Sequence, residues 1–374
     1  MALLPQPTSV LVVGGCGFVG YHIVRYLLQD ATFASVAVLS RSAPQNTGYQ
    51  VHGAKYFSGD ITDLNSLRQA LQAIKPTVII HASAPPPTTG SAKDYKRVIV
   101  GGTRNLLQLA LESKEVQAFV YTSSNMVTRG REHLDTKEDH PLANTDPKAP
   151  AYARAKADAE EMVLKANTLP EFSIKNYDWS GFLATGALRF PIVYGTHNST
   201  AVSGCMAAVR NKETNVLIGD GDNIWSYCST QNVAESHALL AHALLGPDFS
   251  TIAGEAYNIN DGEPRLFWGF VREVWRIVGH EDKKDLSTKI PAWLALALAD
   301  ILEFFFWVFT LGRKRPGLLG RQQVEYCCFT HTYNIDKARE RLGFMPKQNY
   351  EEILRESVRW LQEEHMGIHG LAKS

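Results

Sequence analysis

The sequence predicts an α/β protein built on a doubly wound parallel sheet, with a smaller C-terminal lobe. Two observations lead to this fold class. A glycine-rich turn joins a short apolar strand to an amphipathic helix near the N-terminus, and strands then alternate with helices along the first half of the chain. With 374 residues, 45% of them hydrophobic, the chain is long enough to bury a substantial core.

The first strand is the β-branched run Val10–Val13, and an apolar-periodic helix is expected over 19–28. Glycines suit the turn between them because it needs positive φ, a backbone close to a pyrophosphate and tight packing of helix on strand. A tight βα turn without a ligand is the alternative, but the repeating βα pattern favours a dinucleotide-binding Rossmann sheet. The residues expected to hold the cofactor there are Gly14, Gly15, Gly17, Phe18, Val19 and Gly20.

The βα pattern continues with apolar runs that predict further strands of the same sheet. Helical periodicity is expected around 64–74 and 94–113. The predicted strands are Val36–Leu39, Lys55–Phe57, Thr77–Ile80 and Ala118–Tyr121.

Residues after the second and third strands bear on the choice of cofactor. Where an acid would bind the adenosine 2′-hydroxyl, the chain has Arg41 between two serines, which favours the 2′-phosphate of NADP over NAD. Stacking of Arg41 on adenine, or a plain surface charge, are the alternatives. Asp60, followed by Ile61, is expected to accept from the adenine amino group unless it caps a helix.

Tyr152 and Lys156 stand four residues apart in an Ala-rich stretch, which places them on one helical face. A nearby cation favours the phenolate, so we expect Lys156 to lower the pKa of Tyr152 and make it a proton acceptor. Ser124 lies 28 residues earlier and is expected to join them. The same pattern recurs at Tyr333 and Lys337, where Asp336 resembles a helix cap and leaves the tyrosine outside the helix.

With these residues in order, the chain resembles the extended short-chain dehydrogenases/reductases, and within them the 3β-hydroxysteroid dehydrogenases and sterol-4α-carboxylate 3-dehydrogenases (decarboxylating). The resemblance extends over nearly the whole chain. It includes the turn His81–Pro85 with Ala82, the serine strand Tyr121–Ser124, the strand Leu188–Gly195, and later segments at 254–259 and 336–344.

The resemblance implies a role for each matching residue. Tyr152 would be the acid/base, and Ser124 would hydrogen-bond the substrate oxygen, with Ser123 the weaker candidate. Lys156 would hold the nicotinamide ribose, and backbone groups near Pro191 and Val193 would orient the carboxamide.

The chain departs from the family pattern at two positions. Ile99 stands where the family usually has Asn, which removes a proton-relay candidate, and Phe190 replaces a proline after Arg189.

Several features favour a hydrophobic polycyclic substrate over a nucleotide-sugar. The turn Gly219–Gly221 is followed by Trp225 instead of the arginine that grips the diphosphate in sugar-nucleotide epimerases, and an indole cannot neutralise a phosphate. Other aromatic residues expected to supply apolar area, or else to pack in the core, are Phe267, Trp268, Trp275 and Trp293.

The segment 290–311 is the most apolar in the chain and precedes the basic run Arg313–Arg315. It is long enough to cross a bilayer, but Asp300 and Glu303 interrupt one face. We therefore expect a helix in the membrane interface or over a lipid-like pocket, giving peripheral membrane contact through 290–315, ahead of a true span. A buried helix of the C-terminal lobe is the remaining alternative.

Bulk properties exclude several classes of function. Lysine plus arginine and aspartate plus glutamate number 38 each, which argues against nucleic-acid binding. The N-terminus lacks signal-peptide character, and the five cysteines show no metal or disulfide spacing, so we expect a cytoplasmic protein, peripheral at the endoplasmic reticulum membrane. His365 and His369 are helix-spaced without a nearby third ligand, and no metal site is predicted.

The expected organisation is an NAD(P)-binding domain over 1–190 and a substrate lobe over 191–374 that returns strands to the main sheet. Residues 129–150 are expected to form a substrate-side loop and 167–186 an insertion. By the resemblance, the helices near 94–113 and 151–166 would pair in a homodimer, and their apolar faces are expected to be exposed.

Three functions stay open. The first is NAD(P)-dependent oxidation of a 3β-hydroxyl on a sterol, triterpenoid or meroterpenoid, with C-4 decarboxylation where the substrate allows it. The second is an NADPH-dependent ketone or aldehyde reductase of the dihydroflavonol-reductase type. The third is a catalytically silent dinucleotide-binding regulator.

Overall fold

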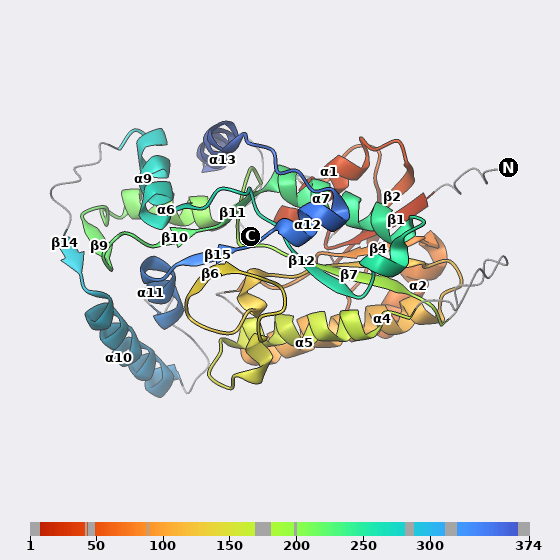
Figure 1. The fold of residues 1–374 in the computed structure, drawn as a ribbon, viewed down its shortest axis with the longest axis horizontal. Helices are drawn as coiled ribbons and strands as arrows, with labels where there is room; N and C mark the ends of the chain where they lie inside the picture. Colours follow the sequence, from red (N-terminus) through yellow and green to blue (C-terminus); the bar gives the residue numbers. More distant parts are fainter. Residues whose placement is uncertain are drawn as a thin grey trace.

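A seven-stranded parallel sheet forms the centre of the molecule in the order β12-β7-β5-β4-β1-β2-β3 (Figure 1). The computed structural model describes residues 8–41, 43, 49–87, 90–168, 181–197, 200–280, 288–310 and 320–365. The fold class predicted from the sequence is confirmed. The strands are β1 (Thr8–Val13), β2 (Phe33–Ser40), β3 (Lys55–Ser58), β4 (Val78–His81), β5 (Ala118–Thr122), β7 (Ala184–Arg189) and β12 (Glu255–Asn258).

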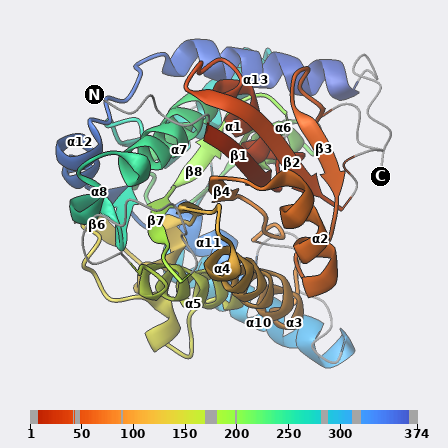
Figure 2. The same cartoon turned by 90° about the vertical axis from the view of Figure 1, so that its right-hand side faces the viewer.

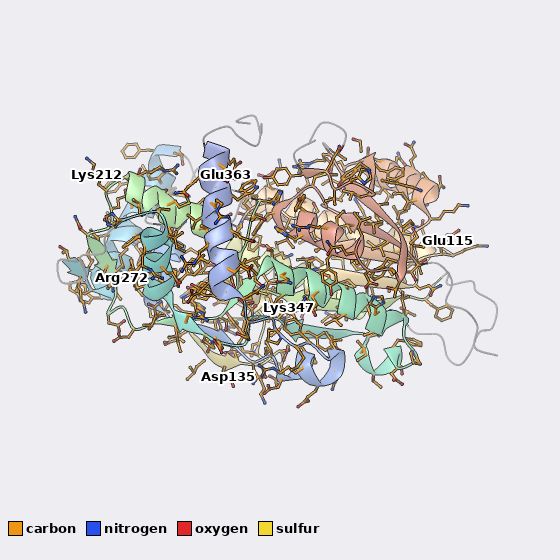
Figure 3. All side chains as sticks on the ribbon, turned by 90° about the horizontal axis from the view of Figure 1, so that it is seen from above. Glu115, Asp135, Lys212, Arg272, Lys347 and Glu363 are labelled. Atoms are coloured by element: carbon orange, nitrogen blue, oxygen red, sulfur yellow. The ribbon has the colours of Figure 1, made fainter. Side chains whose placement is uncertain are left out.

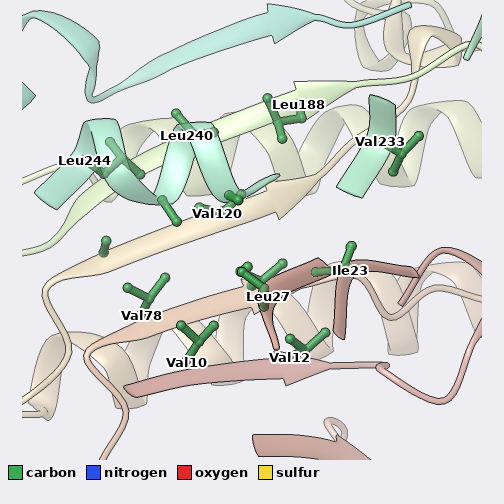
Figure 4. Packing of buried hydrophobic residues seen from close by; sticks show 14 of the residues in the cluster. Val10, Val12, Ile23, Leu27, Val78, Val120, Leu188, Val233, Leu240 and Leu244 are labelled. Carbon is green, nitrogen blue, oxygen red and sulfur yellow. The ribbon is translucent and has the colours of Figure 1, made fainter. Parts of the chain in front are cut away.

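Helices cover both faces of this sheet (Figure 2). On one face, Val10 and Val12 pack with residues of α1 (Phe18–Leu27) and α7 (Thr230–Leu245), including Ile23 and Leu240 (Figure 4). On the other face, the alternate residues of β1 pack against helices α2 (Leu64–Ile74), α4 (Gly102–Glu112) and α5 (Ala151–Lys165). Both faces of the central strands are therefore buried, as a parallel sheet requires.

The helix expected over 94–113 is divided into three segments. It begins as the single turn α3 (Ala92–Tyr95), which carries a capping box between Ser91 and Asp94, continues as the π-helix η2 (Lys96–Gly101), and ends as α4. Wide π turns are rare and cluster at functional sites.

The C-terminal part builds smaller sheets beside the main one and returns β12 to its edge. A four-stranded sheet has the order β13-β10-β15-β6, and two strand pairs, β8 with β11 and β9 with β14, complete the set. The strands are β6 (His133–Thr136), β8 (Ile192–Tyr194), β9 (Val216–Ile218), β10 (Ile224–Trp225), β11 (Tyr227–Ser229), β13 (Arg265–Leu266), β14 (Thr288–Ile290) and β15 (His331–Tyr333).

The remaining helices pack against these small sheets or against the edge of the main sheet. Residues 129–150, expected as a loop, contain β6 and the 3₁₀ turn η4 (Ala143–Thr145), and the predicted insertion 167–186 lies largely outside the described residues. The helices are η3 (Asn125–Val127), α6 (Thr200–Arg210), α8 (Phe249–Ile252), α9 (Phe267–Ile277), α11 (Arg321–Cys328), α12 (Asp336–Leu342) and α13 (Tyr350–His365).

The apolar segment forms the helix α10 (Ala292–Thr310), which lies at the edge of the molecule (Figure 1). Its only buried residues are Ala295 and Ala299, so the alternative of a buried helix is wrong. Within the part of the chain that the structure describes, it is the one helix long and apolar enough to cross a membrane. Its exposed large side chains are Trp293, Leu294, Leu298, Ile301, Phe304, Phe305, Trp307, Val308 and Phe309.

Two features of the surface concern its charged side chains and the exposed positions of α4 and α5. Charged side chains of both signs lie around the periphery, among them Lys212 and Glu115 at opposite ends of the view in Figure 3. The expectation of exposed apolar faces on α4 and α5 is wrong, because their leucines and alanines pack into the core. Their exposed positions are polar: Arg104, Gln108, Glu112, Asp158 and Lys165.

Candidate active site

The glycine turn connects β1 to α1 at the carboxyl edge of the sheet. Gly14 has φ +88°, and its N–H donates to the carbonyl of Leu39 at 2.8 Å, which ties the turn to β2. A Cβ at Gly20 would overlap the carbonyl oxygen of Gly14, so only glycine lets α1 start this close to the turn. Gly17 forms the N-cap, and the first N–H groups of α1 are thus available at this edge.

The turn sits at the topological switch point, between β1 and β4. Ala82 donates its N–H to the carbonyl of Val13 at 2.9 Å, and a Cβ on Gly14 would lie 2.8 Å from Cα of Ser83. Ligands of doubly wound sheets bind at this position, where neighbouring strands lead to opposite faces. The bare backbone fits a dinucleotide pyrophosphate, which the N-terminus of α1 would hold.

The residues that follow β2 and β3 lie at the same carboxyl edge of the sheet as the glycine turn. Arg41 is exposed, and its carbonyl accepts from the Ser58 hydroxyl at 3.0 Å. Asp60 accepts from the backbone and hydroxyl of Thr62, while the cap of α2 is Asp63, so Asp60 does not cap that helix. Burial opposes ionisation of Asp60, but these hydrogen bonds and nearby arginines outweigh it and lower its pKa.

Ile61 is buried and fixed by α4. Asn105 donates to its carbonyl at 3.0 Å, and the side chain packs so tightly on Gly102 that a Cβ there would lie 2.5 Å from Ile61 Cδ1. The expected adenine-side residues are therefore held by the sheet and by α4 together.

Helix α5 carries Tyr152 and Lys156 on the face that packs against β5. The Lys156 ammonium donates to the carbonyl of Thr122 at 2.5 Å and lies 4.3 Å above the ring of Tyr121. Small buried residues at Ala153, Ala155, Ala157 and Ala159 let the helix approach the sheet. Lys156 is thus anchored to the strand that leads into Ser123 and Ser124.

The pKa values of this pair differ from the expectation. Burial lowers the pKa of Lys156 to about 7, although Glu160 one turn later opposes the shift. Burial, together with Tyr326 and Tyr95, raises the pKa of Tyr152 above its usual range. Desolvation dominates the pKa of Tyr152 in this structure, and the Lys156 ammonium is directed to the carbonyl of Thr122. That Lys156 lowers the pKa of Tyr152 stays a prediction.

The two neighbouring serines have different environments. Ser123 is buried and donates to Glu160 at 2.5 Å, and Glu160 also forms a buried ion pair with Arg189 at 2.6 Å. Ser124 is partly exposed and begins η3, accepting from the N–H of Met126 at 3.2 Å. The Ser123 hydroxyl is committed to a buried network with Glu160 and Arg189, so Ser124 stays the better candidate for a contact with a substrate oxygen.

The segment after β7 runs beside these serines. Asn125 donates its N–H to the carbonyl of Phe190 at 2.9 Å, and Phe190 stacks on His237 with ring centroids 5.3 Å apart. Pro191 and Val193 are half-buried, and Val193 belongs to β8. Their backbone follows the strand end near Ser124.

The structure adds residues that sequence patterns did not single out. The Tyr326 hydroxyl contacts Sδ of Met126 at 2.9 Å, and its ring lies 5.1 Å from that of Trp225, edge to face. The ring of His331 lies 4.3 Å from that of Trp225. Tyr326, Trp225 and His331 form an aromatic wall that contacts Met126, two residues after Ser124. No local signal could reveal it, because α11, β10 and β15 meet only in the folded chain.

The other tryptophans expected near substrate lie elsewhere. Trp268 and Trp275 pack in the core beneath α10, and their indole N–H groups donate to backbone carbonyls. Trp293 is 71% exposed on α10. Of the four tryptophans named, Trp225 packs against the wall residue Tyr326.

A profile of the 3-beta hydroxysteroid dehydrogenase/isomerase family matches residues 11–290. The chain belongs to this family. It is 31% identical to a sterol-4-alpha-carboxylate 3-dehydrogenase, decarboxylating, of Saccharomyces cerevisiae, over 95% of this chain and 98% of the relative. The human enzyme of the same description is 26% identical, over 94% of this chain and 88% of the relative. The family expected from the sequence motifs is confirmed.

Solved structures show the same fold as this family member. A dTDP-glucose 4,6-dehydratase from Bacillus anthracis in complex with NAD has a TM-score of 0.66 at 20% identity, covering 96% of this chain and 98% of the other. A UDP-glucose 4-epimerase from Thermus thermophilus in complex with NAD has a TM-score of 0.66 at 24% identity, covering 95% and 99%.

The departures from the family pattern have structural counterparts. Ile99, where the family usually has Asn, is buried in the π-helix η2. The repeated Tyr-x-x-x-Lys pattern at Tyr333 and Lys337 does not place the two side chains on one helix: Tyr333 lies in β15, whereas Lys337 lies in α12 and donates to Glu255 at 2.7 Å.

Proposed function

We propose that this protein oxidises the 3β-hydroxyl of a sterol, triterpenoid or meroterpenoid to a ketone with NAD(P). The observation that carries the proposal is the position of Tyr152 and Lys156. They lie on one face of α5 against β5, which leads into Ser124. The relatives that match nearly the full length of the chain support a sterol-type substrate.

Each residue has a role in this proposal. The substrate hydroxyl would bind between Ser124 and Tyr152, and Tyr152 would take its proton while the carbinol carbon loses a hydride. Lys156, whose pKa of about 7 makes it responsive to nearby charge, would hold the ribose and stabilise the phenolate. The nicotinamide, when bound, supplies the hydride acceptor.

Decarboxylation needs no further catalytic group. If a carboxylate is attached at C-4, oxidation at C-3 makes a β-keto acid. The C-4–carboxyl bond then breaks, carbon dioxide leaves, and the electron pair moves into the C-3 carbonyl as an enolate that is protonated at C-4. The substrate, more than the protein, decides whether this step follows.

We infer NADP as the preferred cofactor. The support is the exposed guanidinium of Arg41 at the end of β2, where a 2′-phosphate would lie, and the glycine turn that fits the pyrophosphate. An Arg41→Ala variant should weaken NADP selectively; an unchanged ratio of the two dissociation constants would exclude this inference.

The test of the activity uses purified protein with a 4-carboxy-3β-hydroxy sterol and either cofactor. We expect absorbance of the reduced nicotinamide to rise, with a decarboxylated ketone as the product by mass spectrometry. Absence of turnover combined with NADPH-dependent ketone reduction would favour the reductase of the dihydroflavonol type. Dinucleotide binding without either reaction would favour a silent regulator.

We propose that α10 contacts the membrane peripherally. Its two acidic residues bind Arg321 of α11: Asp300 pairs with the guanidinium at 2.6 Å, and Glu303 accepts from the backbone N–H at 2.8 Å. Its aromatic residues face outward, as expected of an interfacial helix. The basic run Arg313–Arg315 lies outside the described residues. A sterol substrate is itself a membrane lipid, which supports a position at a membrane, and we propose the endoplasmic reticulum.

A homodimer remains a proposal that rests on the family resemblance, since the exposed positions of α4 and α5 are polar. Light scattering in detergent gives its mass directly; a monomer at micromolar concentration would exclude a stable dimer.

A further inference from the structure

Tyr95 is a buried residue that touches both the candidate acid/base and the loop after β4. Its ring packs edge to face against Tyr152, with centroids 5.4 Å apart and planes at 76°. Its hydroxyl donates to the carbonyl of Pro86 and accepts from the N–H of Gly90, each at 2.9 Å. The side chain is 3% exposed, so these contacts are fixed by packing.

The loop that Tyr95 holds starts beside the glycine turn. It leaves β4 through Ala82 and Ser83, which abut Gly14. A Cβ at Gly90 would lie 2.5 Å from the Tyr95 ring, so the loop and the ring fit without space between them. One side chain thus connects the proposed pyrophosphate edge with the phenol proposed to move the proton.

The π-helix explains how Tyr95 reaches this position. It begins directly after Tyr95, at Lys96, and a π turn adds a residue to the helical repeat. The extra residue changes the register between α3 and α4, so that α4 still packs on Ile61 while α3 presents Tyr95 to α5. The family's usual Asn position is filled by Ile99, an apolar residue that packs in the same core cluster as Tyr95.

We propose that Tyr95 is a positioning residue for Tyr152, which it holds in place and screens from water through ring contact, and which it links to the loop after β4 through its hydroxyl. The inference rests on the proposed role of Tyr152. It adds to that role a second tyrosine that does not touch the reacting atoms and yet sets the orientation and ionisation of the one that does.

The test compares Tyr95→Leu with Tyr95→Phe in the full-length enzyme. Tyr95→Leu removes the ring and the hydroxyl, so we expect kcat to fall about 10- to 100-fold, because small displacements of a reacting group cost that much. Water admitted beside Tyr152 should also move the acidic limb of the kcat/KM profile to lower pH. Tyr95→Phe retains the ring, so it should restore the profile and most of kcat. Affinity for the dinucleotide should change little in either variant.

Tyr257→Leu is the matched control. Tyr257 is fully buried on β12, and its hydroxyl donates to Ile252 at 2.9 Å. It should lower thermal stability without changing kcat of the folded enzyme. Wild-type kcat and pH profile in Tyr95→Leu would overturn the proposal.

If the wild-type protein turns over no sterol, the proposed function fails and Tyr95 is tested separately. Carbon-13 labelled tyrosine spectra, with Tyr152 assigned by Tyr152→Phe, report its environment without substrate. An unchanged Tyr152 resonance in Tyr95→Leu would then overturn the positioning role, whereas a shifted one supports it.

Discussion

At the scale of single residues, burial dominates the chemistry of the candidate site. Lys156 is 3% exposed. Its ammonium contacts the carbonyl of Thr122 and the ring of Tyr121, whereas the ammonium of a surface lysine is hydrated by water. Desolvation lowers the pKa of Lys156 and raises that of Tyr152, because burial disfavours the charged form of each group. A pair in this state responds strongly to any charge brought beside it.

Replacing Tyr152 with Phe should abolish measurable turnover, a loss of about 10²- to 10⁴-fold, because the proton acceptor is lost and little else changes. Stopped-flow or steady-state rates would measure it, with dinucleotide titration as the check on binding. Tyr257→Phe, which also removes a buried tyrosine hydroxyl, should retain its rate. Equal rates in Tyr152→Phe and the wild type would refute the assigned role.

Ser123→Ala and Ser124→Ala should separate structure from catalysis. Ser123→Ala leaves the buried Glu160 without one donor and should lower the free energy of unfolding by about 1–3 kcal/mol, with kcat nearly intact. Ser124→Ala should leave stability close to wild type and lower kcat. Denaturant unfolding and initial rates, measured on the same preparations, test both expectations. A loss of kcat in Ser123→Ala with wild-type kcat in Ser124→Ala would assign the substrate contact to Ser123.

At the scale of elements, the closest backbone approach in the site is made by the glycine turn. Gly20→Ala forces a Cβ into the carbonyl of Gly14 and should weaken dinucleotide binding and lower the melting temperature. Gly204→Ala in α6 is the control, because no atom lies within 4 Å of its added Cβ. That change should be neutral or stabilise by up to about 1 kcal/mol. Equal melting temperatures and affinities in both variants would contradict this account of the turn.

The outward face of α10 should bind lipid. Phe305→Glu with Trp307→Glu should reduce co-sedimentation with phospholipid vesicles several-fold, because charge replaces apolar area that would enter the interface. Leu134→Glu provides the control, since Leu134 is 75% exposed on β6. If the α10 double variant sediments like the wild type, membrane contact lies elsewhere.

Elements with strong local signals could be predicted from the sequence. The run Val10–Val13 lies inside β1, and the apolar periodicity of 64–74 matches α2, because strand length, helix caps and glycine turns are short-range properties. Strands of two or three residues such as β10 and β15 carry too little pattern. The contact between Tyr95 and Tyr152 joins two separate helices, and the acidic residues of α10 bind Arg321 of α11. A local pattern specifies neither contact.

At the scale of the whole molecule, burial of neutral histidines links stability to pH. Burial lowers the pKa of His81 and His331 to about 3, and that of His22, His133 and His237 to about 4, from an ordinary value of 6.5. Between these values the unfolded chain binds protons that the folded one does not. The stabilisation is therefore complete above pH 6.5 and is lost as the pH falls through about 4 and, for His81 and His331, through about 3.

We therefore expect the free energy of unfolding to decrease steeply on acidification, with each such histidine contributing about 1.4 kcal/mol per pH unit in this window. Guanidinium midpoints from pH 7 to 4.5 would measure the slope. A His237→Gln variant should reduce the slope by about one proton. A flat profile across this range would show that these imidazoles already carry charge in the native protein.

The position of β12 at the sheet edge has a consequence for biosynthesis. During translation, Arg189 leaves the ribosome well before Glu255–Asn258, the only strand that pairs with β7 on its outer side in the described chain. In the interval the nascent chain presents an unpaired parallel edge, and α7, which packs on α1, emerges only in the later part of that interval. A ribosome that stalls between these points carries an incomplete nucleotide-binding domain whose exposed strand edge can pair with other chains. This is the stage at which a chaperone would be most needed.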